Sequence, residues 1–67
     1  MPVITYAGSE MSEEKKRSLV EQLTEAASEV SGIPAKSFTV LIQEYPQNAI
    51  GIGGETLKDI KSRLADG

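Results

Sequence analysis

The strongest strand pattern in the chain is Ser37-Phe38-Thr39-Val40-Leu41-Ile42-Gln43. Alternate residues of a strand point to opposite faces, which places Phe38, Val40 and Ile42 on one face and the residues between them on the other. Because both sets contain apolar residues, we expect both faces of this strand to be covered.

A long helix is predicted directly before this strand, over residues 13–31. Ser12 is a suitable N-cap, and Gly32 followed by Pro34 is typical of a helix end. Apolar residues at three- and four-residue steps predict one buried stripe, formed by Leu19, Leu23, Ala26, Ala27 and Val30. The basic residues 15–17 point in different directions around the helix, so we interpret them as solvated surface.

A first strand is predicted over residues 2–7, ending at Gly8. A strand, a helix and a second strand form a βαβ unit, an α/β fold in which the two strands lie parallel with a right-handed connection. The helix covers only one face of this sheet. The bare face, which carries Leu41 or Phe38 depending on the register, is expected to bury against another copy of the chain.

The remainder of the chain is predicted to form a short hairpin and a second helix. A turn at residues 45–48 precedes the glycine-rich residues 49–54, which suit a hairpin or a bulged edge and do not match a phosphate-binding loop. Thr56 can cap a helix over residues 57–65. No linker or repeat divides the sequence, so residues 1–67 are predicted to form a single domain.

Composition supports a small protein that associates with itself. A 67-residue chain without Cys or His has neither disulfides nor the common zinc sites to support its small core, which makes oligomerisation the expected support. With 7 basic and 10 acidic residues, the net charge of −3 gives no reason to expect nucleic acid or a membrane as a partner. We expect a cytoplasmic protein.

Pro2 is a candidate catalytic residue. A small residue after the initiator Met favours removal of Met1, which would leave a secondary amine at the start of the first strand. Burial in an apolar pocket lowers the pKa of such an amine toward working pH, so it can act as a general base. The alternative is that Pro2 only begins an edge strand, where its missing N–H is tolerated.

Nearly the whole chain resembles the 4-oxalocrotonate tautomerase family of very small enzymes. The matching segments are Pro2, Ser12-Glu13-Glu14-Lys15-Lys16, Val40-Leu41-Ile42-Gln43-Glu44 and Gly51-Ile52-Gly53-Gly54-Glu55. The glycine-rich segment is the most specific of the four. This resemblance implies a homo-oligomer, most simply a hexamer of βαβ subunits whose active sites draw on more than one chain. It also implies a freed proline that moves a proton across a conjugated enol or 2-keto acid, without metal or cofactor.

The sequence departs from the family pattern at three positions. Two arginines that bind substrate carboxylates are replaced by Met11 and Thr39, and a phenylalanine before the glycine run is replaced by Ile50. The predicted site therefore consists of Pro2 as catalyst, an apolar wall from these three residues, and Ser37 as a hydrogen-bonding group. A small molecule with fewer negative charges than a diacid is the expected substrate.

Three functions remain open from the sequence. The first is a cofactor-independent tautomerase that uses Pro2, and the second is a non-catalytic oligomer that acts as a binding or structural module. The third is a related reaction such as hydration-dehalogenation or decarboxylation, which the missing arginines disfavour. The sequence also leaves open whether Lys36, Arg17 or Arg63 of a neighbouring subunit replaces the missing positive charge.

Overall fold

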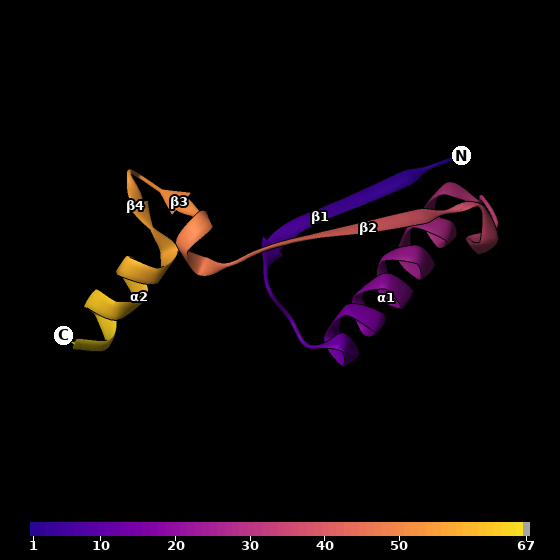
Figure 1. Ribbon diagram of the computed structural model, residues 1–67. Helices are drawn as coiled ribbons and strands as arrows, with labels where there is room; N and C mark the ends of the chain where they lie inside the picture. The colour runs from indigo at the N-terminus through magenta and orange to yellow at the C-terminus, as the bar shows by residue number, and fades with distance from the viewer. Residues whose placement is uncertain (67) are drawn as a thin grey trace.

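The computed structural model describes residues 1–66 and shows a βαβ unit followed by a hairpin and a helix (Figure 1). The elements are β1 (Val3–Ser9), α1 (Glu13–Ser31), η1 (Ala35–Ser37), β2 (Thr39–Tyr45), η2 (Gln47–Ala49), β3 (Gly51–Ile52), β4 (Glu55–Thr56) and α2 (Leu57–Asp66). Strands β1 and β2 are parallel, in a register that runs from Val3 opposite Thr39 to Ser9 opposite Tyr45. The predicted fold class is confirmed. The last residue of the predicted single domain, Gly67, lies outside the described part.

Helix α1 begins and ends where the sequence predicted. The Ser12 hydroxyl accepts a hydrogen bond from the Lys15 backbone N–H at 3.2 Å, which satisfies one free donor of the first turn. At the other end, Gly32 adopts a φ of 76° and its N–H donates to the Ser28 carbonyl at 2.9 Å. This left-handed conformation is easy for glycine and ends the helix.

The predicted buried stripe of α1 is only partly correct. Leu19, Leu23 and Ala27 are half-buried against the sheet, whereas Ala26 is exposed and Val30 is 90% exposed. Ala26 and Val30 are four residues apart and so share a flank of the helix. The sheet of one chain is too narrow to cover this flank.

Both predicted strands were placed too early in the sequence. Strand β1 continues through Gly8 to Ser9 because its pairing with β2 continues to Tyr45. A Cβ on Gly8 would lie only 3.1 Å from the Tyr6 ring, so glycine here makes room for the aromatic side chain. Ser37 lies in the 3₁₀ turn η1, where its N–H donates to the Pro34 carbonyl at 2.9 Å, and β2 begins two residues later.

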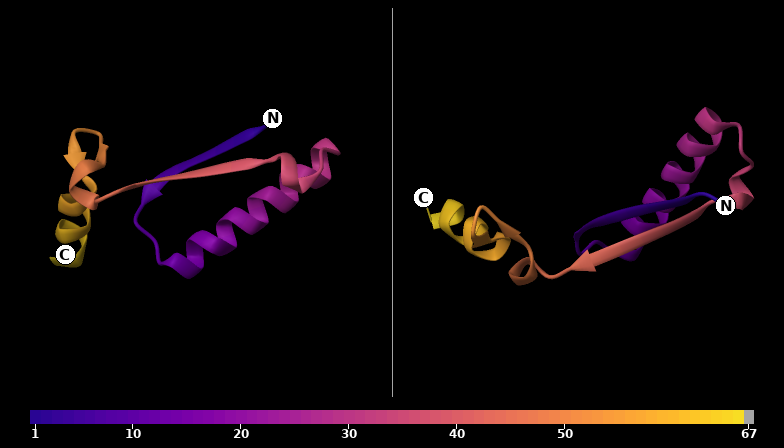
Figure 2. Two further views of the ribbon diagram at one scale, coloured as in Figure 1. Left: turned by 45° about the vertical axis from the view of Figure 1, so that its right-hand side comes forward. Right: turned by 90° about the horizontal axis from the view of Figure 1, so that it is seen from above.

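The register decides which face of the sheet α1 covers. Val40, Ile42 and Glu44 of β2 are half-buried on the side of α1, whereas Leu41 lies on the open face and is 47% exposed. Figure 2 shows that no other element within residues 1–66 lies over that open face. The sequence did not decide whether Leu41 or Phe38 lies on the bare face. The register places Leu41 there.

The C-terminal part forms the predicted hairpin and helix. Strands β3 and β4 pair antiparallel, with Ile52 opposite Glu55, and Gly53 and Gly54 have φ values of 62° and 91°. Two positive φ angles suit a two-residue hairpin turn and favour glycine. The Thr56 hydroxyl accepts from the Asp59 N–H at 3.2 Å at the start of α2, as predicted for a capping residue.

The single chain has no buried core. None of residues 1–65 is buried, and the C-terminal hairpin and α2 stand away from the βαβ unit (Figures 1 and 2). The radius of gyration is 15.7 Å, whereas a compact domain of this length has one of about 11 Å. The accessible surface is 5104 Å², compared with roughly 4,100 Å² for a compact monomer of this mass. These values describe an extended chain whose apolar residues are not enclosed by the chain itself.

Within residues 1–66, neither helix has the length and apolar character needed to cross a membrane. The cytoplasmic location stays a prediction from composition.

Candidate active site

Pro2 lies at the head of the parallel sheet and is fixed there by the first backbone hydrogen bond between the strands. Its carbonyl accepts from the Thr39 N–H at 3.0 Å, and the residue is half-buried. Beside it is a surface hollow of about 450 Å³, lined by Met1, Pro2, Ile33, Lys36, Ser37, Phe38 and Thr39. The structure therefore brings together three predicted site residues, Pro2, Ser37 and Thr39, within one chain.

The turn η1 positions the far side of this hollow. The Ser37 N–H donates to the Pro34 carbonyl, and the Phe38 N–H donates to the Ala35 carbonyl at 3.1 Å. These bonds fix the backbone conformation of residues 36–38 beside Pro2. The hollow thus combines apolar walls, two hydroxyl-bearing side chains and one charged side chain.

Met11 and Ile50, the other two predicted site residues, lie away from Pro2. Met11 follows the far end of β1, and six residue steps along that strand span roughly 20 Å. Ile50 lies beyond the same end of β2, where its carbonyl accepts from the Leu57 N–H at 2.7 Å. A single chain does not assemble all five predicted residues into one site.

The end of the sheet near Met11 is closed by Glu44. One carboxylate oxygen of Glu44 accepts from the Lys16 ammonium at 2.8 Å, and the other accepts from the Met11 backbone N–H at 2.7 Å. The hydrogen bond from Lys16, followed by that from Met11, holds the pKa of Glu44 below its ordinary value. The hydrogen bond to Glu44, followed by its negative charge, raises the pKa of Lys16.

The prediction that residues 15–17 are all solvated surface was therefore wrong for Lys16. The signal was available in the strand pattern, because Glu44 follows Val40 and Ile42 on the covered face of β2. A carboxylate at an inward strand position needs a partner, and α1 is the element that faces it. Lys15 and Arg17 remain exposed, and Arg17 pairs with Glu13 at 3.4 Å as its spacing indicates.

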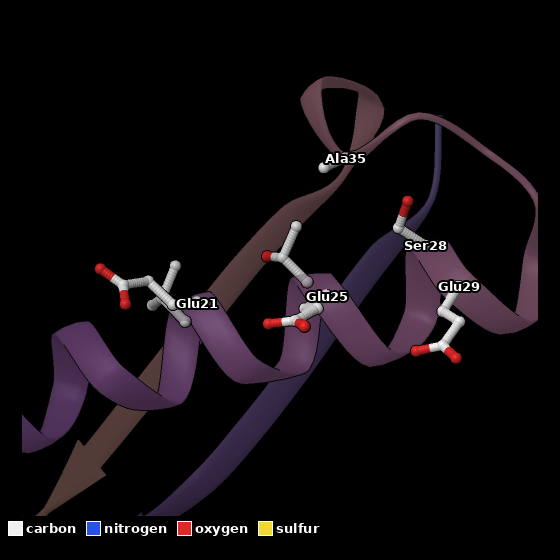
Figure 3. Close-up of a pocket in the computed structure, with 7 residues that line it drawn as sticks. Glu21, Glu25, Ser28, Glu29 and Ala35 are labelled. Carbon is white, nitrogen blue, oxygen red and sulfur yellow. The ribbon is translucent and has the colours of Figure 1, made fainter.

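A larger hollow, of about 580 Å³, lies along α1 and is shown in Figure 3. Its lining residues are Val20, Glu21, Thr24, Glu25, Ser28, Glu29 and Ala35. Figure 3 shows the three glutamates in a row along the helix, below Ala35. No cation or amine lines this hollow, so it would repel an acidic substrate, and the smaller hollow at Pro2 is the better candidate for the active site.

The sequence did not predict two walls of the Pro2 hollow, Ile33 and Phe38. Ile33 lies in the short connection after α1, where no periodicity assigns a direction to a side chain. Phe38 was assigned to a strand face, but in the structure it precedes β2. Both lie beside Pro2 because parallel pairing aligns the beginnings of the two strands.

The fold and this site define a class of small α/β proteins, in which a single βαβ unit carries a proline at the start of its first strand. A family model described as "Tautomerase enzyme" matches residues 3–60. A probable tautomerase of Bacillus cereus is 38% identical over 60 residues, which cover 88% of this chain and 98% of that protein. The 2-hydroxymuconate tautomerase of Bacillus subtilis is 34% identical over 62 residues, covering 91% and 100%.

A solved structure supports the same assignment. The crystal structure of TomN, a 4-oxalocrotonate tautomerase homologue in the tomaymycin biosynthetic pathway, matches with a TM-score of 0.88 at 29% identity. The match covers 91% of this chain and 95% of that chain. The chain belongs to the tautomerase family of isomerases, as the resemblance in its sequence indicated.

Proposed function

We propose that this enzyme is a cofactor-independent tautomerase whose catalytic base is the Pro2 amine, freed by removal of Met1. The observation that carries the proposal is the position of Pro2. The residue is held by the 3.0 Å hydrogen bond from Thr39 at the edge of a hollow that a small molecule can enter. With Met1 attached, the Pro2 nitrogen is an amide without basicity, so the proposal requires the mature terminus.

The surroundings of Pro2 suit a base that works near neutral pH. Ile33 and Phe38 line the same hollow and offer little solvation to an ammonium group, which favours the neutral amine. Rigid placement by the strand pairing also keeps the amine within reach of a bound substrate. These features support Pro2 without requiring any further side chain as the base.

The proposed reaction moves one proton within a conjugated enol. The neutral Pro2 amine takes the proton from the enol oxygen, and the electrons of that O–H bond form the carbonyl. The displaced π electrons of the conjugated system form a new C–H bond at its far carbon by taking the proton from the ammonium, which restores the neutral amine. The Ser37 hydroxyl lines the hollow and is available to donate a hydrogen bond to the carbonyl oxygen as it forms.

We further propose that the enzyme is a homo-oligomer, most simply a hexamer, with Met11 and Ile50 supplied to each site by neighbouring chains. Support comes from the absence of buried residues within 1–65 and from the bare sheet face that carries Leu41. On the exposed flanks of the helices, Val30 is 90% and Leu64 is 69% exposed. Exposed apolar surface of this extent is typical of subunit interfaces.

The proposal is tested by comparing protein with a free Pro2 terminus and protein in which Met1 is retained. Intact mass identifies the terminus of each preparation. Tautomerisation of a 2-hydroxydienoate, followed by its ultraviolet absorbance, should fall by about 10²- to 10⁴-fold when Met1 blocks the amine. An electrophilic 2-keto acid such as bromopyruvate should label the N-terminal peptide before the lysines.

The matched control is Pro2→Ala, which keeps a free amine and so should retain more activity than the blocked protein. Equal activity with and without Met1 would overturn the role of Pro2. No turnover of any enol by the free-terminus protein would instead favour the second function, a non-catalytic oligomer. The specific observation that favours this alternative is the lack of arginine at positions 11 and 39.

A further inference from the structure

We propose that Lys36 binds the carboxylate of the substrate and that this enzyme therefore prefers a monocarboxylate enol. This inference rests on the proposed tautomerase function of the Pro2 site. The structure selects Lys36 from the three cations that the sequence left open. Lys36 comes from the same chain as Pro2, so no neighbouring subunit is needed to supply it.

The other two cations each have an acidic partner within the chain. Arg17 is paired with Glu13 at 3.4 Å, and Arg63 is paired with Glu55 at 2.8 Å. Within residues 1–65, whose side chains the structure describes, Lys36 forms no ion pair with an acidic residue. Its ammonium group is available to a ligand without breaking an existing contact.

The position of Lys36 is suited to this role. Among the side chains that line the hollow beside Pro2, Lys36 is the only one that carries a charge. The hydrogen bonds of η1, which involve Ala35 and Ser37 on either side of it, fix its backbone. A flexible side chain on a fixed backbone can follow a small anion, while Pro2 remains in place at the other side of the hollow.

The chemistry of the hollow also predicts the charge of the substrate. In a 2-hydroxyenoate the carboxylate is bonded to the carbon that bears the enol hydroxyl, so binding the carboxylate at Lys36 directs that hydroxyl toward Pro2. The other side chains that line the hollow carry no charge. Ile33 and Phe38 are apolar, and the hydroxyls of Ser37 and Thr39 are neutral, so a second carboxylate would find no cationic partner. Because the hollow offers one cationic side chain, it suits a substrate with one carboxylate.

The test compares Lys36→Gln with the unchanged enzyme on two substrates. One is 2-hydroxypenta-2,4-dienoate, a monocarboxylate, and the other is an uncharged enol such as 2-phenylethenol. We expect KM for the monocarboxylate to rise about tenfold in Lys36→Gln, because a charge-assisted hydrogen bond is lost. Turnover of the uncharged enol should change less than about twofold, since a neutral substrate has no carboxylate for Lys36 to bind.

Two further variants separate a charge effect from a structural one. Lys36→Arg keeps the charge and should restore KM for the monocarboxylate, whereas Lys36→Glu should raise it further. The matched control is Lys61→Gln, which removes an exposed positive charge from α2 and should leave both substrates unaffected.

The possible failures can be told apart. An active enzyme in which Lys36→Gln leaves KM for the monocarboxylate unchanged would overturn the role of Lys36 alone. Equal losses on both substrates would also overturn it, because a merely structural role predicts that result. If the unchanged enzyme turns over neither substrate and bromopyruvate does not label Pro2 first, the proposed function itself fails.

Discussion

The two ends of the β1–β2 sheet differ. We call the end near Tyr45, where Glu44 has partners in the same chain, the closed end, and the end at Pro2 the open end. At the end near Tyr45, the Glu44 carboxylate is held by the Lys16 ammonium and the Met11 backbone N–H of the same chain. At the opposite end, Pro2 borders a hollow in which Lys36 has no acidic partner among residues 1–65. Polar groups satisfied inside the chain stabilise the fold, whereas a charge left open beside a hollow is available to a ligand.

The distance between the two ends of the sheet explains why the predicted site residues fall into two groups. Pro2, Ser37 and Thr39 lie at the open end, whereas Met11 and Ile50 lie beyond the closed end. A single chain cannot bring the two groups together, because the rigid strand pair separates them by roughly 20 Å. If all five residues serve one site, the site must be completed by assembly.

The largest effect is expected from Leu41→Asp on the bare face of the sheet. An unpaired carboxylate buried in an interface destabilises it by about 3–5 kcal/mol, so the variant should dissociate or unfold. Light scattering should show the loss of the oligomer, and tautomerase activity should fall with it. Leu41→Met, which conserves volume and apolar character, should leave both unchanged. A fully active monomeric Leu41→Asp protein would show that the open end is complete by itself.

An intermediate effect is expected from Thr39→Arg at the open end. A second cation beside Pro2 would give a dicarboxylate enol the partner that Thr39 does not provide, and should raise kcat/KM for a 2-hydroxydienedioate by about ten- to a hundredfold. Steady-state kinetics on mono- and dicarboxylate substrates measure this change in selectivity. Thr39→Gln, of similar bulk but uncharged, should bring no such gain. A dicarboxylate preference in the unchanged enzyme would place the anion site elsewhere.

The smallest effect is expected from Glu44→Gln at the closed end. Because Lys16 lowers the pKa of Glu44, the ion pair stabilises the fold above the ordinary carboxyl pKa of 4.5, and this contribution is lost as the pH falls below that value. The Tm of Glu44→Gln should therefore lie below that of the unchanged protein at pH 7, and the difference should shrink at pH 3. Protein concentration must be equal in both scans, because assembly affects Tm.

The matched control for this last prediction is Glu21→Gln, an exposed helix substitution. It should leave the Tm nearly unchanged at both pH values. A difference for Glu44→Gln that is the same at pH 3 and pH 7 would show that the Lys16–Glu44 pair does not account for the stability of the closed end.

Features that depend on neighbouring residues in the chain could be predicted from the amino-acid sequence. The limits of α1 follow from Ser12 and Gly32, whose capping conformations need only the adjacent residues. The hairpin turn follows from two glycines that accept positive φ, and the start of α2 follows from Thr56. Pro2 was identified as the candidate base in the same way, from its place behind Met1 and from the family resemblance.

Features that depend on the pairing of β1 with β2 could not be predicted in this way and are known from the folded chain. The register extended β1 to Ser9, directed Leu41 to the bare face, and placed Glu44 opposite Lys16. It also brought Lys36 beside Pro2, 34 positions away in the sequence. Local patterns carry no information about such distant contacts, because the alignment of parallel strands is fixed by hydrogen bonds and packing across the whole sheet.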